Sequence, residues 1–338
     1  MAWTTGGPKR GREWGLLWRG VGLLAITAAA LVGCQPAKGP ESAGQPAAGE
    51  TFVIGFSQCT TTEPWRVLFN ELLIAQAKTS PAIGLVVLDA QDRTEKQVAD
   101  MESFINRKVD AILISPKEAA GLTGIVARAT DAGIPVIVLD RGVNTEKYAA
   151  FLGGDNVEIG REVGRYCVEV LGGPGQAKGN IYEIWGGKGT PASHDRHNGF
   201  YEVVSGEAGI KVEGDQDGDW KQEKGYNIMQ TRLQLPGKID LVYAHNDPMA
   251  FGAYLAAKDA GRDKEIRFVG VDAIPNEGCQ WVKNGQLAAT FVYPPPGGEG
   301  LHLAWRLLHG QSVAKRTLLP TSRITRESVD AYLESLKQ

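Results

Sequence analysis

The chain repeats a set of short apolar segments. Each segment is a run of β-branched and aromatic residues, as is typical of a β-strand. Three of them are followed about 130 residues later by three similar ones in the same order: 52–56 by 181–185, 109–113 by 239–243 and 134–140 by 266–272. Composition alone does not explain three matches in one register. We infer two structural repeats of one architecture.

Strand-like and helix-like segments alternate from residue 51 onward. Continuous apolar runs, typical of parallel strands covered on both faces, lie at 52–56, 85–88, 111–114, 136–139, 181–185, 211–213, 241–243, 268–271 and 288–292. Amphipathic segments predict helices at 94–107, 156–171, 219–232 and 247–260, with Asp219 as the N-cap of the third. The fold class is therefore α/β, with two similar doubly wound parallel-sheet lobes.

The first fifty residues are of a different kind. Residues 1–33 read as a secretory signal, in which a basic stretch precedes a twelve-residue apolar run, 21–32, too short to span a bilayer. The run ends in Leu-Val-Gly-Cys at 31–34, which resembles the bacterial lipobox and predicts that Cys34 is lipidated. Residues 34–50, rich in Pro, Ala and Gly, form an expected flexible tether.

Charge and cysteine content exclude several classes of function. With a formal net charge of −3, the 338-residue chain has no basic footprint for nucleic acid. Lipidation of Cys34 would leave Cys59, Cys167 and Cys279. Their separations in the sequence are too wide for a paired metal-ligand motif, and the sequence allows either three free thiols or one disulfide. No Gly-x-Gly-x-x-Gly follows the first strand. We expect no cofactor, no metal and no catalytic residues.

Polar residues follow the predicted strands where the strands end. Parallel α/β sheets bind ligands beyond the carboxyl ends of their strands. In this chain those ends carry 57–58, Asp89, Ser115 and 140–141 in the first repeat, and 186 onward, 215–220, 245–247 and Asp272 in the second. Phe56, Trp65, Trp185 and Trp220 fall near the same ends. A polar cleft with aromatic faces suits a monosaccharide, since charged groups bind adjacent hydroxyls and rings pack on C–H faces.

The order and spacing of these motifs carry a family resemblance. The sequence resembles the type I periplasmic sugar-binding proteins of ABC transporters, in the ribose-binding-like group, and within it the galactofuranose-binding proteins. The matching stretches are 53–58, 65–66, 109–112, 134–136 with 139–141, 195–196 with 199–200, 218–220, 243–247 and 270–272. They extend over nearly all of residues 51–300.

The resemblance implies an architecture and partners. Two lobes, expected at 51–153 with about 293–321 and at 154–292 with about 322–338, are joined by three crossing strands that act as a hinge. The ligand is a monosaccharide, most similar in class to a furanose or pentose. The partners are the transmembrane subunits of an ABC permease and, through the lipid on Cys34, the membrane. The protein is expected to be a monomer in the cell envelope, periplasmic or otherwise extracytoplasmic.

The resemblance also implies which residues bind the ligand. Carried over by position, the polar contacts come from Arg66, Asp140, Arg141, Arg196, Asn246 and Asp272. Trp220 stands where members of the family usually have a Phe that packs on the sugar ring. Phe56, Gln58, Trp65 and Tyr293 are further candidates, and Tyr293 lies in a proline-rich stretch that departs from the family pattern.

Other interpretations of these residues remain open on sequence alone. Asp140 and Asp272 are also suited to cap turns after strands, and Asn246 to cap a helix. Arg196 could be a solvated charge and Trp220 a core residue. Alternative functions are a sugar sensor that feeds a chemoreceptor or histidine kinase, a transcription regulator core of the same fold, and a secreted enzyme that acts on sugars.

Overall fold

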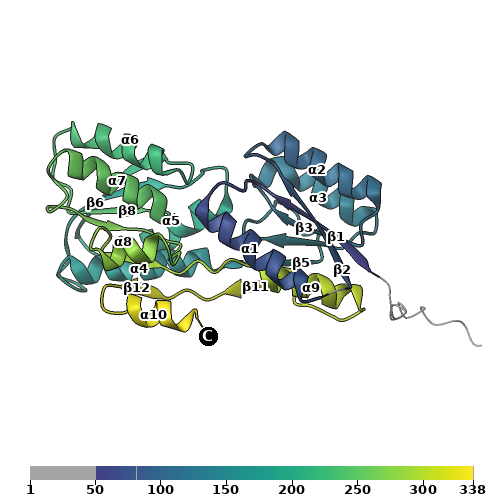
Figure 1. Ribbon diagram of the computed structural model, residues 1–338. Helices are drawn as coiled ribbons and strands as arrows, with labels where there is room; N and C mark the ends of the chain where they lie inside the picture. The colour runs from purple at the N-terminus through teal and green to yellow at the C-terminus, as the bar shows by residue number, and fades with distance from the viewer. Residues whose placement is uncertain (1–50, 81, 338) are drawn as a thin grey trace, which may run out of the picture. The chain divides into compact units, whose positions relative to one another are not determined.

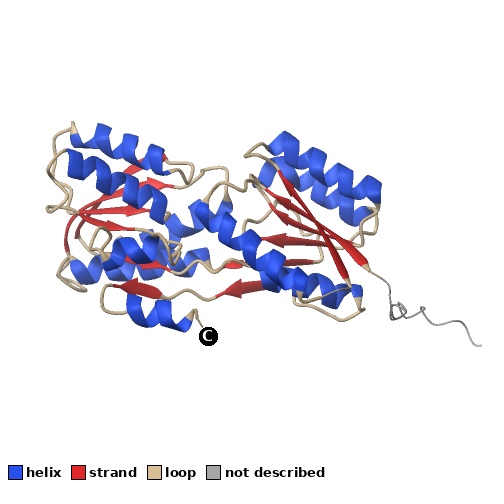
Figure 2. Cartoon of the chain, viewed as in Figure 1, coloured by secondary structure: helices blue, strands red, loops and turns tan. Residues whose placement is uncertain are grey.

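The chain forms two six-stranded sheets, each covered by helices on both faces (Figures 1 and 2). The computed structural model describes residues 51–80 and 82–337. The predicted signal, the tether and Cys34 lie outside these residues. We call the part of the chain built on the first sheet the first lobe and the part built on the second sheet the second lobe. The predicted α/β class with two similar lobes is confirmed.

The first sheet has the spatial order β11-β5-β4-β3-β1-β2. Its strands are β1 (Phe52–Gln58), β2 (Ile83–Asp89), β3 (Ala111–Ser115), β4 (Val136–Leu139), β5 (Ala150–Gly154) and β11 (Arg316–Leu319). Helices α1 (Pro64–Lys78) and α9 (Gly297–Leu308) cover one face, and α2 (Thr94–Arg107) and α3 (Ala119–Asp131) the other (Figure 1). All of its pairings are parallel.

The second sheet repeats this order as β12-β10-β9-β8-β6-β7. Its strands are β6 (Lys178–Trp185), β7 (Gly209–Asp217), β8 (Leu241–Ala244), β9 (Arg267–Val269), β10 (Ala289–Phe291) and β12 (Arg323–Thr325). Its helices are α4 (Asn156–Val170), α5 (Pro191–Val204), α6 (Gln222–Leu233), α7 (Asp247–Asp259), α8 (Gly278–Lys283) and α10 (Val329–Ser335). The first five strands of each sheet correspond in order, so the repeat inferred from the sequence is a repeat of structure.

The chain passes between the sheets at three places. It leaves the first sheet after β5, returns after β10 and crosses again between β11 and β12. Strand β12 pairs antiparallel with β10, which departs from the expected all-parallel sheets. Residues 320–322 alone separate β11 of the first sheet from β12 of the second. The boundaries expected for the two lobes stay a prediction.

Most of the predicted elements are present, and one predicted helix start is wrong. Helix α2 has the expected bounds, and α4 and α7 end one residue early. Helix α6 begins at Gln222 with Lys221 as its N-cap, because Asp219 and Trp220 have φ values of 46° and 66° and form a turn. The sequence reasoning did not assign β5, β11 and β12 as strands.

The buried core runs through both lobes. Its largest cluster packs Phe69 of α1 and Leu301 of α9 in the same group as Ile159 of α4 and Phe200 of α5. Cys59, Cys167 and Cys279 are buried free thiols, so none of them pairs. Within residues 51–80 and 82–337, no helix is both long enough and apolar enough to cross a membrane.

Glycines allow α4 and α5 to pack at close range. A Cβ at Gly199 of α5 would lie 2.0 Å from the carbonyl oxygen of Val157, and one at Gly160 of α4 would lie 2.2 Å from that of Arg196. Backbone atoms cannot yield as a flexible side chain can. These glycines therefore set the distance between the helices, and with it the position of Arg196.

We expect Gly199→Ala to destabilise the protein by about 2–3 kcal/mol, because the new methyl group has no space. Gly124→Ala is the matched control: Gly124 is exposed on α3, and a Cβ there meets nothing within 4 Å. Alanine in a helix interior should instead stabilise by about 0.5–1 kcal/mol. Denaturant unfolding of both variants checks this, and equal effects would contradict the packing argument.

Candidate functional site

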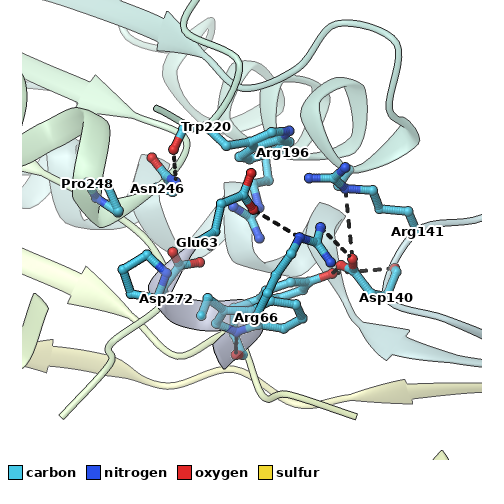
Figure 3. Close-up of a pocket in the computed structure, with 13 residues that line it drawn as sticks. Glu63, Arg66, Asp140, Arg141, Arg196, Trp220, Asn246, Pro248 and Asp272 are labelled. Atoms are coloured by element: carbon cyan, nitrogen blue, oxygen red, sulfur yellow. Dashed lines mark hydrogen bonds and ion pairs between the residues drawn. The ribbon is translucent and has the colours of Figure 1, made fainter. Parts of the chain in front are cut away.

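A cavity lies between the carboxyl ends of the strands of the two lobes (Figure 3). Its empty volume, counted with the solvent space at its mouth, is about 430 Å³. It is lined by Glu63, Pro64, Trp65, Arg66, Asp140, Arg141, Ala192, Arg196, Trp220, Asn246, Pro248, Asp272 and Tyr293. The register of the first sheet aligns these ends, since Gln58 lies opposite both Asp89 and Ser115.

Unusual backbone conformations direct three of the lining side chains. Asp140, Trp220 and Asp272 have φ values of 66°, 66° and 130°. Aspartate tolerates the left-handed φ of Asp140, but the φ of 130° at Asp272 and a left-handed Trp220 are both rare. Strain of this kind persists where the surroundings impose it, and it gathers at functional sites.

The carboxylate of Asp140 is held by the first lobe and a crossing segment. Its Oδ2 accepts hydrogen bonds from Arg66 Nη2 at 3.0 Å and Ser115 Oγ at 2.9 Å. Its Oδ1 accepts one from the Tyr293 hydroxyl at 2.6 Å. Arg66 also donates from Nε to Glu63 and from Nη1 to Gln58 and Ser115. Four of the five N–H groups of Arg66 thus bond within the protein, so Arg66 chiefly positions Asp140.

The two aspartates at equivalent strand ends have opposite pKa shifts. Burial would raise the pKa of Asp140, but the Arg66 and Arg141 guanidinium groups outweigh it and hold that pKa below its ordinary value. Burial and the neighbouring carboxyl group of Asp247 raise the pKa of Asp272 well above its ordinary value. Asp140 is therefore an acceptor only, whereas a protonated Asp272 both donates and accepts.

Arg196 and Trp220 form the wall of the second lobe. Arg196 Nε donates to Asn156 Oδ1 at 2.9 Å and its Nη1 to the carbonyl oxygen of His245. Its guanidinium carbon lies 5.4 Å from the centre of the Trp220 ring and 4.5 Å from that of Tyr293. The Trp220 ring also packs against Gly186, where a Cβ would lie 2.3 Å from it. Glycine at this position makes room for the indole.

Groups with unused hydrogen-bonding capacity gather on the cavity. Among the described residues, none accepts from Nη2 of Arg196, and none donates to the Asp272 carboxyl group. Arg141 donates from Nη1 to the carbonyl oxygen of Lys117 at 3.2 Å, and its Nη2 is likewise without an acceptor there. Two arginines, one carboxyl group and an aromatic ring suit a small ligand with several hydroxyl groups.

The structure brings most of the predicted site residues to the cavity. Nine of the eleven line it, namely Trp65, Arg66, Asp140, Arg141, Arg196, Trp220, Asn246, Asp272 and Tyr293. Asn246 is also the N-cap of α7, where its Oδ1 accepts from Met249 N at 3.0 Å. Trp65 donates from Nε1 to the Tyr293 carbonyl oxygen at 2.8 Å and stacks on that ring.

Phe56 and Gln58 do not line the cavity, contrary to expectation. Phe56 is fully buried and stacks on Phe69, with ring centres 5.3 Å apart, so it belongs to the core. Gln58 is fully buried behind Arg66, and its Oε1 accepts from Arg66 Nη1 at 2.9 Å. Both residues lie within β1, and their side chains pack against Phe69 and Arg66 instead of lining the cavity.

Sequence reasoning missed four lining residues: Glu63, Pro64, Ala192 and Pro248. Glu63 precedes α1 and forms an ion pair with Arg66 at 2.9 Å, three residues on. The sequence contained a signal for Glu63, because this acidic residue precedes a proline at the start of a helix. Side chains three residues apart are neighbours on a helix, which places Glu63 beside Arg66. In the part of the chain that the structure describes, no three His, Cys, Asp or Glu side chains are grouped to hold a metal.

Comparisons with known proteins give one family. Residues 54–312 match the family model of the periplasmic binding protein domain. The chain is 31% identical to the ribose import binding protein of Bacillus subtilis over 301 residues, which cover 88% of this chain and 94% of that protein. It is 34% identical to the galactofuranose-binding protein of Escherichia coli over 232 residues, 66% of this chain and 71% of that protein.

Solved structures agree with this result. The fructose-binding periplasmic domain of a hybrid two-component system is similar with a TM-score of 0.81 and 38% identity, over 85% of this chain and 94% of that one. A galactofuranose-binding protein is similar with a TM-score of 0.79 and 29% identity, over 85% of this chain and 98% of that one.

We expect Asp247 to make stability depend on pH. Burial raises the pKa of this carboxyl group, whose Oδ2 accepts from Thr290 Oγ1 at 2.8 Å, whereas the unfolded chain titrates near the ordinary value. A raised folded pKa gives stability that is present below the unfolded pKa and is lost as pH rises through the folded one. From pH 5 to 8, the thermal midpoint of the wild type should therefore fall by about 2–5 °C more than that of Asp247→Asn.

The exposed Asp131, which forms an ion pair with Lys147 at 3.0 Å, provides the control. Asp131→Asn should follow the pH profile of the wild type. Parallel profiles for the wild type and Asp247→Asn would show that Asp247 is ionised throughout this range.

Proposed function

The chain belongs to the periplasmic binding protein family, as its motifs predicted, and on this premise we propose that it is the substrate-binding protein of a sugar ABC importer. It captures a monosaccharide in the cavity between the lobes and does not transform it. The observation that carries the proposal is the unused hydrogen-bonding capacity of Arg141, Arg196 and Asp272 on that cavity.

The chemistry of the cavity supports a sugar. Guanidinium and carboxyl groups bind pairs of adjacent hydroxyls, and charge-assisted bonds of this kind are stronger than neutral ones. The Trp220 ring offers a flat apolar face for ring C–H groups. A ligand that lacked the hydroxyls would leave these buried groups unpaired, which gives selectivity without a reaction.

A furanose or pentose is the finer proposal. The curated relatives include proteins for import of ribose and for binding of galactofuranose, and both of these are small sugars. The ring centres of Trp220 and Tyr293 lie 5.4 and 4.5 Å from the guanidinium carbon of Arg196, so two bulky rings bound the space beside this donor. This arrangement favours a compact ring over a disaccharide.

Binding is proposed to close the lobes about the three crossings. Arg66, Asp140 and Arg141 belong to the first lobe, and Arg196, Trp220, Asn246 and Asp272 to the second. A ligand that contacts both groups stabilises the closed state by its difference in affinity for the two states. The residues proposed as the hinge are 153–154, 292–294 and 319–321.

We place the protein outside the cytoplasm, in line with the family to which it belongs. The predicted signal at 1–33 and the lipobox-like 31–34 support a lipid on Cys34 that anchors it to a membrane. As a monomer it would present the closed form to the permease subunits. Labelling with a radioactive fatty acid should mark the wild type and not Cys34→Ala, and equal labelling would overturn the anchor.

A sensor is the second candidate function. The similarity to the fructose-binding periplasmic domain of a hybrid two-component system, at 38% identity, favours it. The same capture mechanism would then serve a receptor instead of a permease. Deletion of the gene separates the two, since loss of an importer abolishes sugar uptake, whereas loss of a sensor abolishes induction and leaves uptake by the induced system intact.

A thermal-shift screen tests the sugar proposal. A ligand that binds only the folded protein raises its midpoint, by an amount set by concentration over Kd. Pentoses and hexoses, including sugars rich in furanose forms, should give at least one shift that calorimetry confirms. Recovery of the sugar unchanged excludes an enzyme. If no sugar shifts the midpoint, the proposed function is wrong.

Arg141→Ala is expected to weaken sugar binding at least 100-fold, because a charge-assisted pair of hydrogen bonds is lost in a buried site. Unfolding should remain cooperative. Arg128→Ala removes an exposed arginine of the same lobe, paired with Glu102, and should bind as the wild type does. Titration calorimetry on the three proteins checks this, and an unchanged affinity for Arg141→Ala would remove that residue from the site.

A further inference from the structure

Four charged side chains form a closed ring across the two lobes. Asp92, between β2 and α2, and Lys117, between β3 and α3, belong to the first lobe, while Asp219 and Lys221 follow β7 in the second. Lys117 Nζ lies 2.6 Å from Asp92 Oδ1 and 3.2 Å from Asp219 Oδ1. Lys221 Nζ lies 2.9 Å from Asp92 Oδ2 and 2.8 Å from Asp219 Oδ2. Each carboxylate thus bridges both lysines with separate oxygens.

The ring lies beside a hollow that adjoins the ligand cavity. Asp92 and Lys221 line an outer hollow with an empty volume of about 660 Å³. This hollow shares Glu63 and Trp220 with the cavity described above, so the two spaces adjoin. A ligand that leaves through the hollow passes the ring.

The ring is connected to two ligand-facing residues through the backbone. The carbonyl oxygen of Lys117 accepts from Arg141 Nη1 at 3.2 Å, and Asp219 directly precedes Trp220. Asp92 and Asp219 have φ values of 60° and 46°, so both acids sit on left-handed turns. Such turns aim a side chain along a direction that an extended strand end would not.

The acids of the ring remain charged over the physiological range. Burial would raise the pKa of Asp92, but hydrogen bonds from Lys117 and Lys221 hold it below its ordinary value. Burial acts in the same direction on Asp219, and the two lysines outweigh it and lower its pKa to about 2. The two carboxylates therefore attract the two lysine ammonium groups at neutral pH, and added salt weakens that attraction.

We propose that this ring is a latch, made of positioning residues that hold the lobes closed and fix Arg141 and Trp220 against the ligand. The latch rests on the proposed function and describes how ligand binding by that function is regulated. The pairs Asp92–Lys221 and Lys117–Asp219 join different lobes, so they form on closure and break on opening. The other two pairs lie within one lobe and persist.

The latch raises affinity without contacting the ligand. If ligand binds the closed form, its apparent Kd is the intrinsic Kd divided by the closed fraction of the free protein. Two cross-lobe ion pairs increase that fraction, and they must also break before ligand escapes. Loss of the latch should therefore appear mainly as faster dissociation, and affinity should fall with ionic strength.

A double-mutant cycle on Asp92 and Lys221 tests the latch with the sugar identified by the thermal-shift screen. We expect Asp92→Asn and Lys221→Met each to weaken binding about 5–10-fold, through a faster dissociation rate. The double variant should be no weaker than the worse single variant, since each single variant already removes the Asp92–Lys221 pair that joins the lobes. Lys147→Met, which removes an exposed ion pair within the first lobe, should bind as the wild type does.

The separation of the lobes in the ligand-free protein is the second readout. Fluorescent labels on α3 and α6 should report a smaller closed fraction in both latch variants, and in the wild type at high salt. Additive effects in the cycle, or lobe distances equal to those of the wild type, overturn the latch. If the wild type binds no sugar, the proposed function fails. The distances between the lobes in the ligand-free proteins then still test whether the latch holds the lobes closed.

Discussion

The buried carboxylate of Asp140 is the group on which the rest of the site depends. It would be costly to bury alone, and the protein satisfies it with Arg66, Ser115 and the Tyr293 hydroxyl. Tyr293 lies on a crossing segment, and its ring faces Arg196 of the second lobe at 4.5 Å. One ionised group therefore orders the floor of the cavity and links it to the segment about which the lobes would move.

The two lobes differ in how far their half of the site is organised in advance. In the first lobe, Arg66 and Asp140 bond mainly to each other and to their neighbours, so their positions do not depend on a ligand. In the second, Arg196 and Asp272 keep groups without partners among the described residues. Under the proposed function, Arg66 and Asp140 form a rigid platform, and the contacts that make binding favour closure come from Arg141 of the first lobe and from Arg196 and Asp272 of the second.

The sequence was sufficient to predict the architecture, because strand and helix patterns are local and the repeat tied them together. It also located most of the site, since parallel strands bring their polar ends to one edge. The sequence did not predict side-chain positions that depend on packing against neighbouring residues in the fold. Phe56 and Gln58 lie in β1, just before the lining residues 63–66, and they pack against Phe69 and Arg66 instead of lining the cavity. The turn at Asp219, misread as a helix start, is accompanied by ion pairs with the neighbouring Lys221 and with Lys117, which is distant in the chain.

Strained backbone and ionic contacts explain why that turn exists. A helix beginning at Asp219 would be the local preference, and left-handed φ values at Asp219 and Trp220 oppose it. The four-charge ring offers a compensating attraction on one side, and the packing of the Trp220 ring on Gly186 offers another. The Trp220–Gly186 packing and the Asp219–Lys221 pair lie within the second lobe, whereas the Asp219–Lys117 and Asp92–Lys221 pairs cross between the lobes. Under the proposed latch, closure adds the cross-lobe attraction to the contacts that hold the turn, and so favours the conformation that directs the indole toward the cavity.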